Sequence, residues 1–107
     1  MGYEKTFTVY ILASTNRRLY TGITGDIRAR MLRHKRGIGS QFAARYNINR
    51  LVYYERFQYA RDAIAREKEI KTFYRERKLR MIDEFNPLWI DFAEKWFKDV
   101  QQNEPFE

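Results

Sequence analysis

The strongest constraint on how this chain folds is a pair of short alternating segments near its N-terminus. Over 7–12, the apolar residues Phe7, Val9 and Ile11 alternate with a second set of residues, and the same two-residue period recurs over 19–23. This is the period of a β-strand, in which successive side chains point to opposite faces. Because only a few residues separate the two segments, they predict an antiparallel hairpin. On its buried face we expect one set of side chains from each strand: Phe7, Val9 and Ile11 paired with Leu19, Thr21 and Ile23.

This register would place two tyrosines side by side. Successive side chains point to opposite faces, so Tyr10 and Tyr20 would lie together on the face away from the buried set. A loop of three or five residues around Thr15 produces this register, whereas a four-residue loop over 14–17 would send the tyrosines to opposite faces. Gly22 lies on the tyrosine face, where its missing side chain leaves room for a ligand to approach the backbone.

A basic helix is predicted directly after the hairpin. It covers 27–36, and either Thr24 or Asp26 can cap its first turn. Arg30 and His34 are one helical turn apart and share a face. A guanidinium and an imidazole in this arrangement can approach a single phosphate group together.

The remaining chain predicts one more strand and several helices. We expect a short helix from Ser40 to Tyr46, a third strand over 51–57, a long helix beginning near Ala60, a helix over 75–85, and an aromatic closing helix over about 87–100. With 107 residues the chain suits a single domain, 1–107, with a core over about 6–82. The predicted fold is α/β in the α+β sense: a small three-stranded antiparallel sheet flanked by helices.

One carboxylate lies on an apolar helix face, where removing it from water costs free energy. Glu67 lies in the middle of an apolar stripe on the long helix, formed by Ala60, Ala63, Ile64, Ile70 and Tyr74. A lone buried carboxylate costs several kcal/mol unless it is paired or bound to a metal. Two explanations stand: an ion pair with Lys71 one turn on, or a metal site, for which magnesium suits a single carboxylate.

The charge of the chain points to a polyanionic partner. It carries 21 Lys and Arg against 14 Asp and Glu, a formal net charge of +7, which favours nucleic acid without separating DNA from RNA. The absence of cysteine excludes disulfides, thiolate metal sites and cysteine nucleophiles. No segment has the length of a membrane span or the pattern of a signal peptide, so we expect a cytoplasmic protein.

The positive charge is concentrated between residues 17 and 50, where Asp26 is the only acidic residue. Phe42 and Tyr46 interleave with the arginines there, which is typical of a phosphate-binding surface, although a charge run can also be a solvated helix face. The residues expected to contact the nucleic acid are Gly22, Arg28, Arg33, Lys35, Arg36, Arg45 and Lys71.

These motifs together resemble the GIY-YIG endonuclease domain, from about Thr6 to Ile82. The hairpin carries Val9-Tyr10-Ile11 and Tyr20-Thr21-Gly22, which are similar to the two motifs of the family name. The family's arginine, histidine and metal-binding glutamate match, in order and spacing, Arg30, His34 and Glu67. The size of the chain resembles that of the small stand-alone bacterial members.

The resemblance implies a magnesium-dependent endonuclease, with manganese as the alternative ion and DNA favoured over RNA. Tyr10 would activate water, with its pKa lowered by Arg30 and by a cationic His34. Arg30 would hold the scissile phosphate, Tyr20 would orient phosphate or water, and a metal ion on Glu67 would stabilise the leaving oxygen.

The chain also departs from the family pattern. Thr8 replaces the glycine of the first motif, Thr21 replaces the isoleucine of the second, and Ile23 stands where some members carry a lysine. One alternative is therefore a catalytically inactive nucleic-acid-binding module of the same fold. Another is a protein-interaction domain that uses the aromatic closing helix. The oligomeric state stays open.

Overall fold

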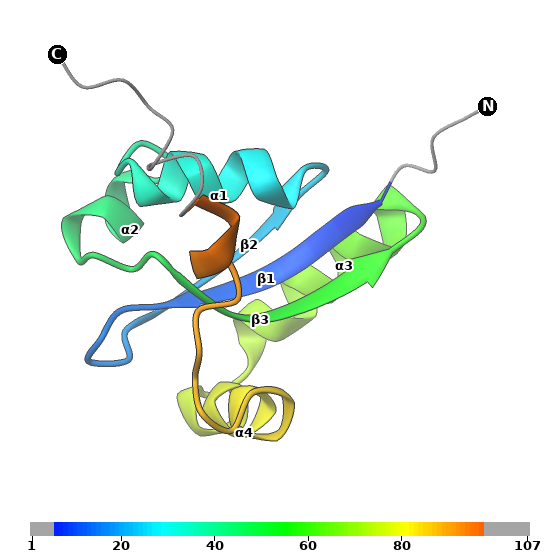
Figure 1. Ribbon diagram of the computed structural model, residues 1–107. Coiled ribbons are helices and arrows are strands. Elements are labelled where there is room, and N and C mark those ends of the chain that lie inside the picture. Colours follow the sequence, from blue (N-terminus) through cyan, green and yellow to red (C-terminus); the bar gives the residue numbers. More distant parts are fainter. Residues whose placement is uncertain (1–5, 98–107) are drawn as a thin grey trace, which may run out of the picture.

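The computed structural model describes residues 6–97, which form a three-stranded antiparallel sheet with helices on both sides (Figure 1). The fold class is α+β, as predicted. The strand order is β2-β1-β3, so the hairpin's first strand lies in the centre of the sheet. In chain order the elements are β1 (Phe7–Ala13), β2 (Leu19–Thr24), α1 (Ile27–Lys35), α2 (Gln41–Arg45), β3 (Arg50–Phe57), α3 (Ala60–Thr72) and α4 (Arg75–Phe85).

The hairpin has the predicted register. Val9 pairs with Ile23 and Ala13 pairs with Leu19, which leaves a five-residue loop over 14–18. Tyr10 lies opposite Gly22, and Leu12 lies opposite Tyr20 on the same face. The two tyrosines therefore share one face of the sheet, and the four-residue loop is excluded.

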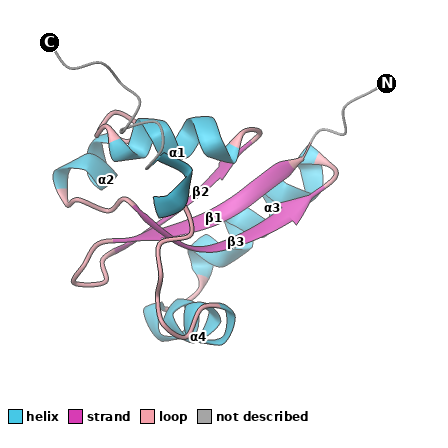
Figure 2. Ribbon diagram, viewed as in Figure 1, coloured by secondary structure: helices cyan, strands magenta, loops and turns pink. Residues whose placement is uncertain are grey.

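Both faces of the sheet are buried, which differs from the expectation of one buried face. The face of Val9 and Ile11 packs against α3 and α4, whereas the tyrosine face is covered by α1, α2 and the segment after α4 (Figure 2). A central strand with layers on both sides loses water from every side chain. Six consecutive residues of β1, Thr8 to Ala13, are consequently buried.

The two helices over the tyrosine face begin at the predicted caps. Asp26 accepts a hydrogen bond from the backbone N–H of Ala29 at the start of α1, and Ser40 accepts one from Ala43 at the start of α2. Such caps satisfy backbone donors that the first turn leaves unpaired. Gly37, with a φ of 76°, ends the turn after α1.

The apolar stripe predicted on α3 is only partly buried. Ala63 and Ile70 are in the core, but Ile64 is 44% exposed. Tyr74 lies beyond the helix, in extended backbone at the start of α4, and is 84% exposed. The break at Phe73, with a ψ of 144°, turns the chain before Tyr74 can reach the stripe.

The predicted closing helix over 87–100 is largely wrong. Residues 87–93 form turns and irregular backbone, and a short helical stretch begins at Glu94 and is described to Phe97; the rest of the predicted helix lies outside the described residues. Trp89 has a φ of 53°, which is incompatible with a continuous right-handed helix. The aromatic side chains still seal the core, because Trp89 packs on the α3 side of the sheet and Phe92, Trp96 and Phe97 pack on the α1 side.

We call residues 86–93 the strap, because they cross the outer edge of β3 from α4 towards α1 (Figure 1). Asp91 accepts hydrogen bonds from the backbone N–H of Leu51 at 3.0 Å and from Ala93, and it pairs with Lys35 of α1. Phe92 donates its backbone N–H to the carbonyl of Leu51 at 2.9 Å. The strap thus satisfies backbone groups that an edge strand would leave open.

Among residues 6–97, no helix is long and apolar enough to span a membrane.

Candidate active site

Three of the predicted site residues, Tyr10, Tyr20 and His34, meet at the β2 edge of the sheet, where the Tyr10 side chain crosses Gly22. A Cβ atom at Gly22 would lie 2.5 Å from the Tyr10 hydroxyl oxygen and 2.6 Å from Cζ. The space over Gly22 is therefore occupied by the tyrosine ring, and the expectation that it admits a ligand is wrong. The absent side chain instead allows the phenol of a central-strand residue to reach the edge.

Helix α1 places its histidine against both tyrosines. The Tyr10 hydroxyl is hydrogen-bonded to Nε2 of His34 at 3.0 Å. The ring centres of Tyr20 and His34 are 5.6 Å apart, and those of the two tyrosines are 6.4 Å apart. Tyr10 and His34 are buried, whereas Tyr20 is half-buried at the rim.

His34 is neutral, which corrects the expectation that it is a cation. Burial, together with the positive charges of Arg30 and Arg33, lowers the pKa of His34 from 6.5 to about 4. The ring fits because of Gly39, where a Cβ atom would lie 2.7 Å from Nδ1. This role of Gly39 could not be predicted from the residue pattern, because Gly-x-Gly is typical of a flexible joint.

The direction of the Tyr10–His34 hydrogen bond depends on which nitrogen of the neutral imidazole carries the proton. With the proton on Nδ1, the Tyr10 hydroxyl donates to Nε2. Nδ1 is buried without a hydrogen-bond partner among the described residues. Arg30 lies close enough to Tyr10 to lower the pKa of its hydroxyl, and a guanidinium can donate a hydrogen bond but cannot accept one.

The pKa of Tyr10 is raised to about 12, opposite to the expected direction. Burial is the largest cause, and the charges of Tyr20 and Glu67 add to it, while Arg30 acts against them through its hydrogen bond and its charge. The prediction failed because it counted cations and omitted the loss of water around a central strand. The influence of Glu67 also shows that α3 brings this carboxylate within electrostatic range of the phenol.

Glu67 forms the ion pair that the sequence offered as one of two explanations. Its carboxylate is 2.7 Å from Nζ of Lys71, and the two side chains are 13% and 53% exposed. This ion pair is compatible with metal binding by Glu67, because the Lys71 side chain is largely in solvent and a metal ion can displace it from the carboxylate. No group of three or more His, Asp or Glu side chains that could hold a metal occurs in the described part of the chain, so a metal ion here would take one carboxylate and otherwise water or phosphate oxygens.

The expected nucleic-acid contacts divide among different parts of the surface. Lys35 pairs with the buried carboxylate of Asp91, and its assignment to phosphate binding stays a prediction. Arg33 is exposed and donates to the carbonyl of Ile38, and Arg45 is exposed beside the ring of Tyr46. Arg36 is exposed on the last turn before Gly37.

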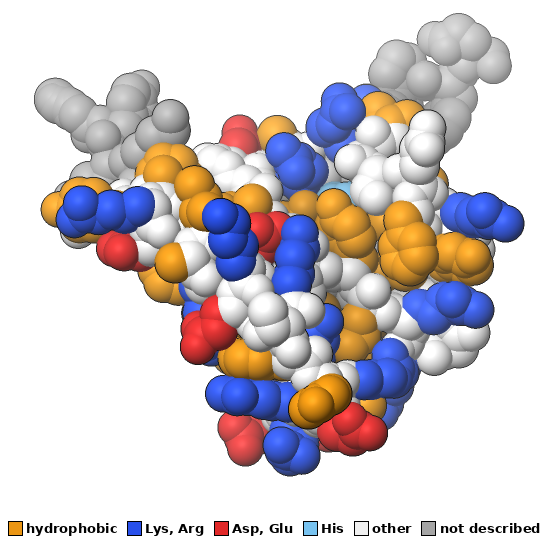
Figure 3. Space-filling model, turned by 180° about the vertical axis from the view of Figure 1, so that it is seen from behind, with side chains coloured by type: hydrophobic (Ala, Val, Ile, Leu, Met, Phe, Trp, Pro, Cys, Tyr) orange, Lys and Arg blue, Asp and Glu red, His pale blue; other side chains and the backbone are white. Residues whose placement is uncertain are grey.

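Arg28 lies on the opposite flank of α1 from Arg30, because two residues rotate the helix by about 200°. Its guanidinium lies 5.0 Å from the ring centre of Trp96, away from the tyrosines. On the face behind the view of Figure 1, Lys and Arg side chains are spread widely, with acidic side chains between them (Figure 3). The basic residues thus do not form a single stripe on the face that Figure 3 shows.

Comparisons with known proteins agree on one family. The sequence model of the GIY-YIG catalytic domain matches residues 6–80. The UPF0213 proteins of Staphylococcus aureus strains Mu50 and N315 are 41% identical over 76 residues, which is 71% of this chain and 93% of each relative. The solution NMR structure of a UPF0213 protein from Bacillus halodurans is similar with a TM-score of 0.54 and 26% identity, over 83% of this chain and 95% of that one.

Proposed function

Because the chain belongs to the GIY-YIG catalytic domain family, a family of nucleases, we propose that it is a metal-dependent endonuclease that hydrolyses phosphodiester bonds in DNA, structured or damaged DNA in particular. The observation that supports this most directly is the contact of Tyr10, Tyr20 and His34 at one edge of the sheet, with Arg30 and Glu67 close enough to act on Tyr10 through their charges. A module that only bound phosphates would gain nothing from a carboxylate at that place.

The tyrosine and histidine pair can move a proton. As water attacks phosphorus, its proton passes to the Tyr10 oxygen while the Tyr10 proton passes to Nε2 of His34. This requires a neutral imidazole with its proton on Nδ1. The lowered pKa keeps His34 neutral at pH 7, and it also makes the imidazole a weaker base. The relay avoids a free phenolate, which a pKa of about 12 would make rare.

Arg30 holds the phosphate that is cut. Its guanidinium is always charged, is half-buried and acts on Tyr10 through its charge, so it would hold the phosphate close to the Tyr10 hydroxyl. Tyr20, at the rim, orients phosphate or water through its hydroxyl. Negative charge on the phosphoryl oxygens would thereby meet a positively charged hydrogen-bond donor.

Glu67 would hold the divalent cation, magnesium or manganese. One carboxylate among water and phosphate oxygens fits magnesium, which keeps several of its waters. Lys71 would release Glu67 for this purpose and become free to contact phosphate. The cation, when bound, supplies stabilisation of the charge on the departing 3′ oxygen.

A second candidate is a nucleic-acid-binding module that does not cut. It is favoured by the complete burial of Tyr10 and by the Glu67–Lys71 pair, which together describe a closed site. In this case the arginines of α1 and α2 would bind phosphates. Tyr10, Tyr20 and His34, which we call the tyrosine cluster, would only support the fold.

One assay separates the two candidates. The purified chain is incubated with single-stranded, duplex, nicked, flapped and branched DNA and with RNA, in magnesium, in manganese and in chelator. Cleavage that requires the metal and is lost in Tyr10→Phe supports the endonuclease. Retention of DNA in chelator, without cleavage under any metal condition, supports the binding module and rejects the endonuclease.

A further inference from the structure

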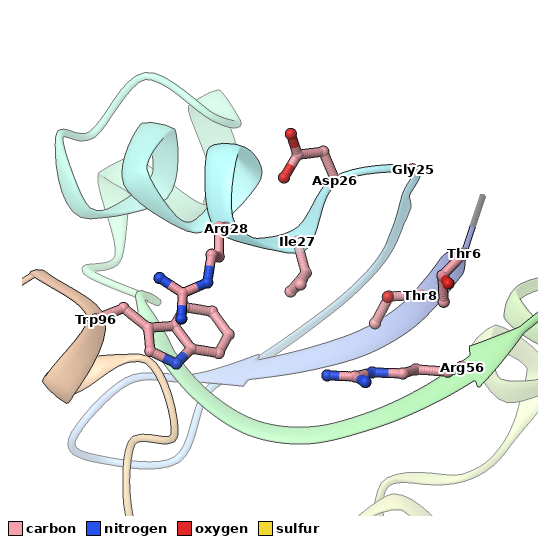
Figure 4. Close-up of a pocket in the computed structure, with 8 residues that line it drawn as sticks. All are labelled: Thr6, Thr8, Gly25, Asp26, Ile27, Arg28, Arg56 and Trp96. Carbon is pink, nitrogen blue, oxygen red and sulfur yellow. The ribbon is translucent and has the colours of Figure 1, made fainter. Parts of the chain in front are cut away.

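A cavity with both polar and apolar walls lies on the flank of α1 that faces away from the tyrosine cluster. It has a volume of about 440 Å³, within the range of about 300–1,000 Å³ that small-molecule sites occupy. Its walls come from the start of β1, the end of β3, the first turn of α1 and the helical stretch after the strap (Figure 4). The residues that line it are Thr6, Thr8, Gly25, Asp26, Ile27, Arg28, Arg56 and Trp96.

Two guanidinium groups reach this cavity from different elements. Figure 4 shows Arg28 descending from α1 and Arg56 extending from β3 along the sheet. Both are exposed, and neither is paired with a carboxylate within residues 6–97; their contacts are with the rings of Trp96 and Tyr54. The carboxylate of Asp26 caps the helix and points away from the sheet. The cavity is therefore positive and suited to a phosphate.

A flat aromatic side chain also lines the cavity. It is the indole of Trp96, and the Arg28 guanidinium lies over its ring, 5.0 Å from the ring centre. Aromatic rings and guanidinium planes are the surfaces on which proteins stack nucleobases. The hydroxyls of Thr6 and Thr8 lie across the cavity from the indole, where they can meet the polar edge of a base (Figure 4).

From these features we propose that the cavity binds one unpaired nucleotide of a nucleic acid strand, with its base on Trp96 and its phosphate between Arg28 and Arg56. An unpaired nucleotide is required, because a base inside a duplex has both faces covered by its neighbours. Since the cavity and the tyrosine cluster lie on opposite flanks of α1, the same molecule can present a single-stranded segment to one flank and a phosphodiester to the other. The binding step does not depend on cleavage.

The test is binding in chelator, where no metal-dependent cleavage occurs, measured by fluorescence anisotropy. A labelled 12-nucleotide single strand is compared with the same sequence as a blunt duplex and as a single strand with abasic sites. The wild-type chain should bind the intact single strand about five- to hundredfold more tightly than the abasic one, the range expected for loss of one stacked base. Equal affinity for the two would overturn the proposal.

Variants locate the effect. Arg56→Gln and Trp96→Leu should each weaken binding of the intact strand at least about fivefold, and Trp96→Phe should retain most of it. The matched control is Arg61→Gln, which removes the same charge from an exposed arginine of α3 that lies beside Tyr59. If Arg56→Gln and Arg61→Gln weaken binding equally, only net charge matters and the cavity is not the site.

Two further arms make the result unambiguous. The first arm measures binding of a free 5′ mononucleotide. If the mononucleotide binds through Arg56 and the oligonucleotide does not compete with it, the cavity binds a free nucleotide and the proposal that it binds a nucleotide of a strand is overturned. Repeating the measurement with Tyr10→Phe should leave the preference for intact over abasic strand unchanged, so failure of the cavity proposal and failure of the endonuclease proposal give different results. Thermal melts of each variant confirm that folded protein is compared.

Discussion

At the scale of single residues, Glu67 is largely buried on α3, as predicted, and it forms the predicted ion pair with Lys71. The carboxylate is 13% exposed and paired with Lys71, yet it still acts on Tyr10 through its charge. An i, i+4 pair with an exposed lysine contributes about 0.3–0.5 kcal/mol. Stability alone is therefore a weak reason for a carboxylate at this point.

We expect Glu67→Gln to reduce cleavage about 100-fold or more, because the proposed metal ion loses its protein ligand. DNA affinity in chelator should be unchanged or slightly higher, since a charge that repels phosphate is gone. The free energy of unfolding should change by less than about 1 kcal/mol. Cleavage assays and urea unfolding measure the two effects separately.

Lys71→Met is the matched variant, because it breaks the same ion pair and keeps the carboxylate. Its cleavage should fall much less than that of Glu67→Gln. A Glu67→Gln chain that cuts at the wild-type rate would remove the carboxylate from the site, whatever its stability.

His34 should make stability depend on pH. The folded chain keeps this imidazole neutral down to about pH 4, whereas the unfolded chain protonates it near 6.5. Between these values the unfolded state binds more protons, so stability is lost as the pH falls, by at most about 1.4 kcal/mol per unit. The unfolding free energy of the wild type relative to His34→Gln should therefore drop by about 2 kcal/mol from pH 7 to pH 5.

The chain has a single histidine, so its ring signals in NMR spectra report the titration directly. A midpoint near 6.5 in the folded protein would contradict both the burial argument and the proton relay.

At the scale of elements, the turn between α1 and α2 decides where the imidazole sits. Gly39→Ala should push the ring away, because the new Cβ atom would lie 2.7 Å from Nδ1. We expect a loss of about 1–3 kcal/mol in stability and a rise of the His34 pKa towards its ordinary value as water enters. NMR titration and thermal melts of the same sample test both.

Gly37→Ala provides the comparison in the same turn. Its φ of 76° strains any L side chain, but a Cβ atom there would meet only Ala44, at 4.0 Å. This variant should lose stability without moving the His34 titration. Equal pKa changes in the two variants would show that the turn as a whole, and not contact at Gly39, positions the ring.

The strap is the element that holds the two layers together at the β3 edge. Asp91→Ala would remove the acceptor of two backbone N–H groups and the partner of Lys35. Because these donors are largely buried, we expect a loss of about 2–4 kcal/mol, measured by urea unfolding. Faster hydrogen exchange at the Leu51 amide would trace the effect to the strap.

Glu94→Ala, at an exposed position shortly after the strap, should stay within about 0.5 kcal/mol of the wild type. An Asp91→Ala chain as stable as this control would mean that the strap does not anchor β3.

At the scale of the whole molecule, the net charge of +7 predicts DNA binding that weakens steeply with salt. Replacing both Arg33 and Arg45 by alanine should flatten the dependence of log K on log salt by up to about 1.8, if each contacts one phosphate of duplex DNA. The control is the double variant Arg61→Ala and Arg80→Ala, which removes equal charge from exposed positions of α3 and α4. If log K falls with log salt at the same slope in the two double variants, binding depends on net charge alone, and α1 and α2 do not form a defined DNA-binding surface.

Much of the architecture was predictable because it is encoded locally. Alternation over 7–12 and 19–23 sets which side chains share a face, and the caps Asp26 and Ser40 act within one turn of their own helices. The order of the elements, the shared face of Tyr10 and Tyr20, and the pairing of Glu67 with Lys71 all follow from spacings of a few residues. The closing segment was misjudged, since an aromatic pattern of helical period was satisfied by a strap that divides its side chains between two faces of the sheet.

By itself, the sequence determined the three strands, the register of the hairpin, the helices from α1 to α4 and the family, but not the path of the chain after α4. Only the tertiary structure decided that the Tyr10 ring packs over Gly22 with a raised pKa and that His34 is neutral. It also decided that Lys35 pairs with Asp91 and that Arg28 lines a separate cavity. The physical reason is the range of the forces. Periodicity and capping depend on neighbours along the chain, whereas desolvation and charge pairing depend on which distant elements remove water from a group.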